Sequence, residues 1–89
     1  MATAVLVFDG EYDVNRVEEL RDEFRHLSDV PKVVLDFREV RFIDSTCIGE
    51  VMRLQAVRQA NKLDEVCILL KAGTAIQRLF DILGLAFQY

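Results

Sequence analysis

The sequence predicts an α/β fold, in which a small mixed β-sheet has helices packed mainly on one face. Three short apolar runs, typical of buried strands, lie at residues 4–8, 33–37 and 66–70. Between and after these runs, apolar residues recur at the three- and four-residue spacing of amphipathic helices. Strands that alternate with helices in this way are typical of α/β domains. A chain of 89 residues is expected to form a single domain over residues 1–89.

The composition narrows the classes of function. Hydrophobic residues make up 52% of the chain, which excludes a disordered protein, and no apolar run reaches the ~20 residues of a membrane span. There are 15 acidic and 11 basic residues, and this net charge of −4 argues against a nucleic-acid partner, which normally requires a basic face. Cys47 and Cys67 lack the spacing of a zinc site, so we expect no metal or cofactor and a cytoplasmic protein with reduced thiols.

The first third of the chain predicts a strand, a turn and a helix. The strand is expected over residues 4–8, and residues 10–12 are expected to turn back as a brief second strand. Asn15 and Glu18 have the spacing of a capping box, which predicts Asn15 as the helix N-cap. The apolar stripe of the helix is formed by Val17, Leu20, Phe24 and Leu27. Residues 28–31 end the helix, because the residue before a proline is disfavoured in the α conformation.

The middle third predicts a strand, a polar bridge and a second helix. The bridge covers residues 38–41 and follows the strand at residues 33–37. The helix is expected from about Thr46 to Asn61. Its inward positions are Ile48, Val51, Met52 and Ala56. Leu54 and Val57 fall off this stripe, which indicates either a wide buried face or an apolar patch for a partner.

The last third predicts a strand at residues 66–70, a turn and a third helix. Thr74 and Gln77 form a second capping-box spacing, and Gly84 supplies a helix stop. The inward positions of this helix are Ile76, Leu79, Phe80 and Leu83. Residues 85–89 are expected to form a short strand or a tail.

Catalysis by this chain is not expected. His26, the single histidine, is predicted on the polar, solvated side of the first helix. The sequence has no GxSxG motif whose serine the histidine could activate as a base. The four glycines are scattered, so no glycine-rich phosphate loop is present.

The segment with the clearest chemical signal is the junction at residues 42–49. Ser45 lies at the junction between the predicted strand and the predicted second helix, where backbone N–H groups and the helix dipole favour an anion such as a phosphate. Alternatively, Asp44, Ser45 or Thr46 merely caps the helix, as residues of these types routinely do. The residues alone leave both interpretations open.

Three segments resemble one known family. Residues 44–49, Asp-Ser-Thr-Cys-Ile-Gly, resemble the signature of STAS domains, and more narrowly the Asp-Ser-Ser/Thr-Gly-Leu-Gly segment of bacterial anti-sigma factor antagonists. Residues 10–13 resemble the family's Gly-Glu-Leu-Asp, and residues 78–85 resemble its closing helix and Gly-Leu turn. The three segments stand in the family's order and extend over nearly the whole chain.

The resemblance implies a switch that is not an enzyme. Ser45 corresponds to the phosphoacceptor, Asp44 to its acidic neighbour and Asp13 to a loop residue near the partner surface. The unphosphorylated domain would bind an anti-sigma factor serine kinase, and a PP2C-like phosphatase would reset it. The partner-binding residues implied in this way are Asp13, Asp44, Ser45, Thr46, Cys47 and Gly49.

Two departures from the family pattern carry consequences. Cys47 stands where the family usually has glycine, which restricts the backbone beside Ser45 and adds a side chain. The chain ends at Tyr89, where many relatives continue into a further helix. An edge or core left uncovered in this way favours self-association, so a homodimer is among the expected partners.

Two alternatives remain. STAS modules also serve as scaffolds in signalling complexes and as cytoplasmic subunits of transport systems. More distantly, Asp9, Asp36 and Lys71 loosely resemble the constellation of a receiver domain, which is phosphorylated on aspartate. A receiver needs about five β-α units, more than this chain supplies.

Overall fold

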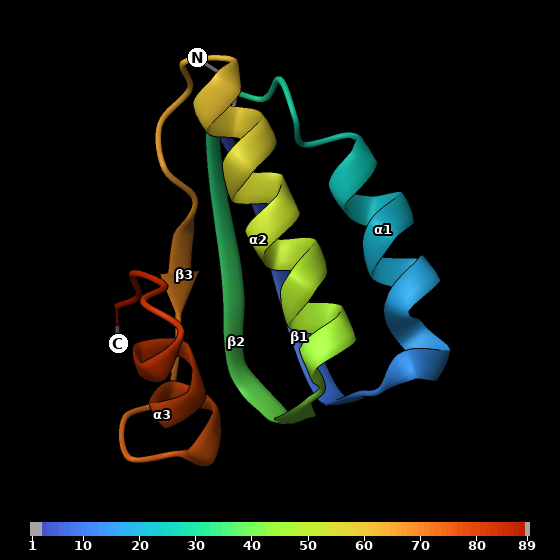
Figure 1. Ribbon diagram of the computed structural model, residues 1–89, viewed down its shortest axis with the longest axis vertical. Helices are drawn as coiled ribbons and strands as arrows, with labels where there is room; N and C mark the ends of the chain where they lie inside the picture. The colour runs from blue at the N-terminus through green and yellow to red at the C-terminus, as the bar shows by residue number, and fades with distance from the viewer. Residues whose placement is uncertain (1–2, 89) are drawn as a thin grey trace.

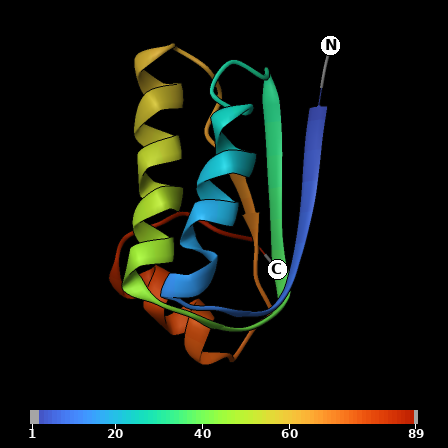
Figure 2. The same cartoon turned by 90° about the vertical axis from the view of Figure 1, so that its right-hand side faces the viewer.

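The computed structural model describes residues 3–88 as a three-stranded sheet with helices. In chain order the elements are β1 (Thr3–Tyr12), the short 3-10 helix η1 (Val14–Arg16), α1 (Val17–Arg25), β2 (Lys32–Ile43), α2 (Ser45–Ala60), β3 (Cys67–Leu69) and α3 (Ala75–Ile82). The strand order is β1-β2-β3, and both pairings are parallel (Figure 1). The helices α1 and α2 lie side by side on one face of the sheet (Figure 2). The α/β fold is confirmed, but the sheet formed by the described strands is parallel rather than mixed.

The predicted return strand and the predicted polar bridge were both wrong. Residues 10–12 continue β1, and residues 38–41 continue β2, so each strand is longer than its apolar run. The register between the two strands shifts twice, and β2 carries an extra residue at each shift. Gly10, with φ of +78°, lies beside one of these irregularities rather than in a tight turn. As a result the buried side chains in the second half of β2 recur every third residue, at Phe37, Val40 and Ile43, which hides the two-residue period of a strand there.

The helix α1 begins differently from the prediction. Asn15 is not its N-cap but lies inside η1, where its backbone N–H donates to the Asp13 carboxylate at 2.9 Å. The 3-10 turn satisfies the first backbone groups, so α1 starts after it. The helix also ends at Arg25, earlier than expected, although Leu27 in the following turn is still buried. The predicted inward stripe of this helix is otherwise confirmed, and His26 is exposed as expected.

The helix α2 begins at Ser45, within a residue of the expected start. Met52 is 43% exposed and Ala56 is also exposed, so these two predicted core positions were wrong. Leu54, which falls off the predicted stripe, is buried instead. The difference arises because α2 packs against both the sheet and α1, so its buried face is turned toward the space between them (Figure 2).

The C-terminal segment forms the predicted elements in shorter versions, but Leu83, a predicted inward position, lies just after α3 and is 42% exposed. The Thr74 side chain accepts a hydrogen bond from the Gln77 N–H at 3.1 Å, as the capping box predicts. Gly84, with φ of +73°, ends α3: its N–H donates to the Asp81 carbonyl, and the Leu85 N–H reaches back to Phe80. Tyr89, at the end of the expected strand or tail, lies outside the described residues.

The two edges of the sheet differ. Gln88 runs parallel beside Leu69 in an isolated bridge and exchanges backbone hydrogen bonds with Ile68 and Leu70, so the chain itself covers part of the β3 edge. The β1 edge pairs with no other strand among residues 3–88. The predicted homodimer stays a prediction.

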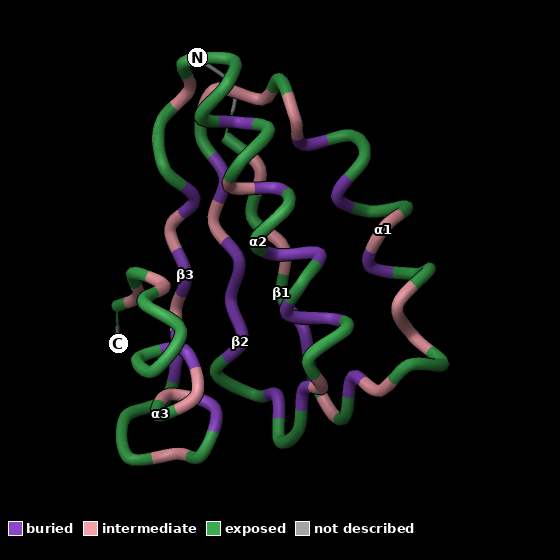
Figure 3. The backbone as a smooth tube through the Cα atoms, viewed as in Figure 1, coloured by how far each residue is buried: buried purple, intermediate pink, exposed green. Residues whose placement is uncertain are grey.

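Arg58 is the most deeply buried of the charged side chains within residues 3–88; Asp36 and Glu50 are also buried. Burial follows the inner face of the sheet and the facing sides of the helices (Figure 3), and Arg58 is 0% exposed among them. Its guanidinium donates to the carbonyls of Leu27, Val30, Pro31 and Asp64. One side chain therefore joins the loop after α1 to the loop after α2. None of the described helices is long and apolar enough to span a membrane.

Candidate functional site

The two loops that carry the predicted site residues lie together at the carboxyl end of the sheet. Tyr12 pairs with Ile43 in the parallel register, so Asp13 and Asp44 follow neighbouring strand ends. The Asp44 N–H donates to the Tyr12 carbonyl at 3.0 Å. The Cys47 thiol donates to the Asp13 carbonyl at 3.3 Å. These contacts connect the loop after β1 directly to the start of α2.

Capping and exposure are divided between adjacent residues at the start of α2. Asp44 is the N-cap, because its carboxylate accepts a hydrogen bond from the Cys47 N–H at 2.9 Å. Ser45 is the first helical residue; it is exposed, and its hydroxyl makes no hydrogen bond to a described residue. The two interpretations left open by the residues thus fall on different side chains: Asp44 caps the helix, and the Ser45 hydroxyl is left facing solvent.

Cys47 differs from the other predicted partner-binding residues in being fully buried. Thr46 and Gly49 are exposed on the first turns of α2, whereas Cys47 is 0% exposed. Burial, helped by the hydrogen bond and charge of nearby Asp44, raises the pKa of the Cys47 thiol to about 12. The side chain that replaces the family's glycine therefore points into the core and fixes the Asp13 loop, and its surface is not available to a partner.

Asp13 has a structural role of its own. Its side chain accepts a hydrogen bond from the Asn15 N–H, and its carbonyl accepts from the Arg16 N–H at 3.0 Å. The residue is half-buried and holds the entry to η1. Any contact it makes with a partner is made by a carboxylate that already caps a turn.

Comparison with known proteins identifies the family. The family model described as "Mlab, STAS domain" matches residues 1–86. The chain belongs to the STAS family. Among solved structures, the anti-sigma factor antagonist SpoIIAA in its unphosphorylated form is similar, with a TM-score of 0.75 and 20% sequence identity over 96% of this chain and 77% of its own. At this identity the likeness shows the fold alone. No curated protein matches the chain.

Arg16 is a residue of this STAS domain's site region that sequence reasoning missed. Its guanidinium lies over the Tyr12 ring, 3.8 Å from the ring centroid, and donates to the Tyr12 hydroxyl at 3.0 Å. It also donates to the carbonyls of Asp9 and Glu11 and forms an ion pair with Glu19 at 2.9 Å. The hydrogen bond that the Arg16 guanidinium donates to the Glu19 carboxylate is the main cause that raises the pKa of Arg16. No motif marks this arginine, because its partners come from the strand before it and the helix after it.

The loose likeness to a receiver domain is not supported by the geometry. The Asp36 carboxylate is held by the Arg38 guanidinium at 2.8 and 3.0 Å, and these hydrogen bonds lower the pKa of Asp36. A receiver's phosphoacceptor instead needs an open carboxylate beside a magnesium site. Among residues 3–88, no cluster of three His, Cys, Asp or Glu residues is placed to hold a metal ion.

Proposed function

We propose that this STAS domain is a phosphorylation-regulated anti-sigma factor antagonist that acts in the cytoplasm. Unphosphorylated, it binds an anti-sigma factor serine kinase; phosphorylation of Ser45 ends that binding, and a PP2C-like phosphatase restores it. The observation that carries the proposal is the exposed, unengaged Ser45 hydroxyl at the first position of α2, next to the Asp13 loop. The fold shared with SpoIIAA, whose structure is described as an unphosphorylated form, adds support.

The surface around Ser45 suits a binding site that a phosphate would block. Ser45, Thr46 and Gly49 are exposed on one end of the molecule, and the Cys47–Asp13 hydrogen bond holds the neighbouring loop in place. The start of a helix tolerates an anion in solvent. The same anion buried under a partner without a counter-ion is strongly unfavourable. Phosphorylation can therefore leave the domain folded and still prevent the complex.

The direct test is to map the phosphorylated residue. We expect incubation with the cognate kinase and ATP to add phosphate at Ser45, located by mass spectrometry, and Ser45→Ala to remove nearly all incorporation. Thr46→Ala is the matched control, because Thr46 is exposed one position further along α2. Phosphate at Thr46 or Ser28 with Ser45 unmodified would contradict the assignment.

Asp13 provides a test that separates capping from partner contact. Asp13→Ala removes the carboxylate that caps η1 and is expected to lower the free energy of unfolding by about 0.5–2 kcal/mol. Asp13→Asn keeps an acceptor oxygen at the cap, so its stability in urea unfolding should stay close to the wild type. If the charge contacts the kinase, Asp13→Asn should still weaken binding at least tenfold, about 1.4 kcal/mol. Unchanged affinity in Asp13→Asn would assign the residue a purely structural role.

A second candidate is a STAS module that serves as a fixed scaffold or as a cytoplasmic subunit of a transport system. Two observations favour it: the matching family model is described as Mlab rather than as an anti-sigma factor antagonist, and buried Cys47 replaces the signature glycine. Purification of the native complex distinguishes the candidates. A co-purifying GHKL-type kinase supports the antagonist, whereas an ATPase subunit of a transporter supports the alternative.

A further inference from the structure

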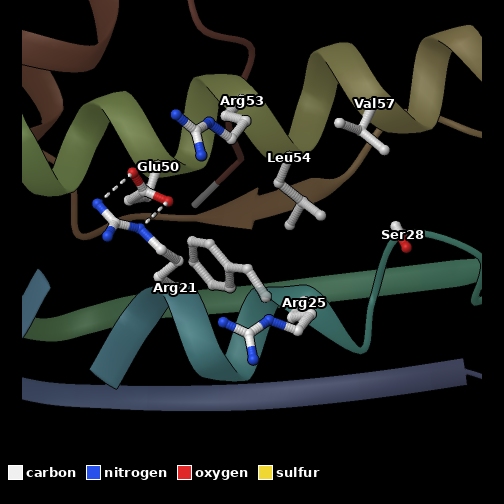
Figure 4. A pocket seen from close by; sticks show the side chains of 8 residues that line it. Arg21, Arg25, Ser28, Glu50, Arg53, Leu54 and Val57 are labelled. Carbon is white, nitrogen blue, oxygen red and sulfur yellow. Dashed lines mark hydrogen bonds and ion pairs between the residues drawn. The ribbon is translucent and has the colours of Figure 1, made fainter. Parts of the chain in front are cut away.

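A groove of about 340 Å³ runs between α1 and α2 (Figure 4). Each helix contributes residues spaced one, three and four positions apart, which places them on one side of that helix. The walls are formed by Arg21, Phe24 and Arg25 of α1 and by Arg53, Leu54 and Val57 of α2. The groove is therefore a continuous feature of two packed helices and not a gap between loops.

The floor of this groove is apolar. Phe24 and Leu54 are buried in the core, 5% and 4% exposed, and each also lines the groove. Val57 is 40% exposed and extends the apolar surface toward solvent. An apolar floor of this kind gains from contact with apolar side chains of a ligand.

The rims of the groove are basic. Arg25 and Arg53 come from opposite walls (Figure 4). Arg53 is exposed and forms no ion pair within residues 3–88, and Arg25 has only an exposed pair with Asp22, at 3.1 Å on its own helix. Two cationic groups thus flank an apolar floor on a chain whose net charge is −4.

One acidic side chain lines the groove, and it is already paired. Glu50 is 8% exposed, and both of its carboxylate oxygens accept from the Arg21 guanidinium at 3.4 Å. This pair joins α2 to α1 and neutralises the carboxylate (Figure 4). The cations that remain for a ligand are Arg53, which forms no ion pair within residues 3–88, and Arg25, whose exposed pair with Asp22 is weak, so the groove is complementary to an anionic surface.

We propose that this groove binds an acidic amphipathic helix of a partner protein. The apolar face of that helix packs on Phe24, Leu54 and Val57, and its carboxylates face Arg25 and Arg53. A groove between two helices accepts a third helix by ridge-into-groove packing. Exposed ion pairs contribute little affinity each, so the apolar contacts supply most of the binding and the arginines select the acidic partner. The α2 residues that line the groove come after the first turn of the helix, which carries Ser45. The proposal does not depend on phosphorylation.

The test uses two synthetic helical peptides of about four turns with the same leucine face. One carries glutamates along both flanks, and the other carries lysines at the same positions. We expect the acidic peptide to shift the amide NMR signals of Phe24, Arg53 and Val57 in the full chain, with affinity falling about tenfold between low and high salt. Equal binding of the lysine peptide, absence of binding, or shifts confined to other surfaces would overturn the proposal.

Variants that reverse or remove the charge of single arginines locate the contact. Arg53→Glu is expected to weaken the acidic peptide at least tenfold, and Arg25→Gln to weaken it by a smaller factor. Arg41→Glu is the matched control, because Arg41 is an exposed arginine on β2, 77% exposed and 4.0 Å from Glu11. It should change the affinity less than about twofold. An equal loss of affinity in Arg41→Glu would show attraction by overall charge and would reject the groove. A dimer in sedimentation that Arg53→Glu dissociates would also reject the proposal, because a second copy of the chain would then fill the groove.

Discussion

Arg58→Met is expected to lower the free energy of unfolding by about 3–5 kcal/mol, a large part of the stability of a chain this size. The side chain is 0% exposed and donates to four backbone carbonyls in two loops. Methionine fills much of the volume but provides no donor for those carbonyls, of which the Leu27 carbonyl belongs to a buried residue. Burial lowers the pKa of Arg58, because removal from water disfavours the charged guanidinium. The four hydrogen bonds to carbonyls act in the opposite sense and stabilise the side chain in the core.

Urea unfolding measures this effect, with Arg53→Met as the matched control. Arg53 is on the same helix but exposed, so its replacement should change stability by less than about 0.5 kcal/mol. Arg58→Lys should fall between wild type and Arg58→Met, because an ammonium keeps the charge and has fewer donors to place. Wild-type stability in Arg58→Met would show that the two loops hold together without the guanidinium.

Phosphorylation of Ser45 is expected to reduce binding of the anti-sigma factor kinase more than a hundredfold while leaving the domain folded. A hundredfold change corresponds to about 2.7 kcal/mol, less than the cost of burying an unpaired charge. Asp44 already occupies the Cys47 N–H, and its carboxylate adds a negative charge beside the new phosphate. The phosphorylated domain is therefore stable while water solvates the phosphate, and burial of the phosphate under a partner is unfavourable.

Binding and NMR measurements on authentic phosphoprotein check this prediction. Ser45→Ala should bind the kinase and resist inactivation, whereas Ser45→Asp, with a single charge, should lose only part of the affinity. Amide shifts between the two forms should be confined to residues 44–49 and the Asp13 loop, which Cys47 joins to α2. Shifts that extend to Leu35 in β2 and Ile68 in β3 would contradict a local effect of charge and would indicate a conformational switch.

Several features of the fold were predictable because short-range patterns encode them. The apolar runs at residues 4–8 and 33–37 lie inside β1 and β2, and the three-to-four-residue stripe marks α1. The Thr74 cap depends on an N–H three residues away. The Asp-Ser-Thr segment likewise predicted that Ser45 opens a helix. In each case the deciding interaction lies within a few residues of chain.

The sequence by itself determined the α/β class, the STAS resemblance and the position of Ser45 at a helix start. The tertiary structure alone decided that β2 continues through its polar stretch, because the extra residues arise only when β1 pairs with it. It also decided that Arg58 is buried, through carbonyls up to 31 residues away, and that Cys47 reaches Asp13 across 34 residues. An arginine and a cysteine carry no local signal for such partners. Their burial is set by the packing of α1 and α2 on the sheet, which no short window of sequence contains.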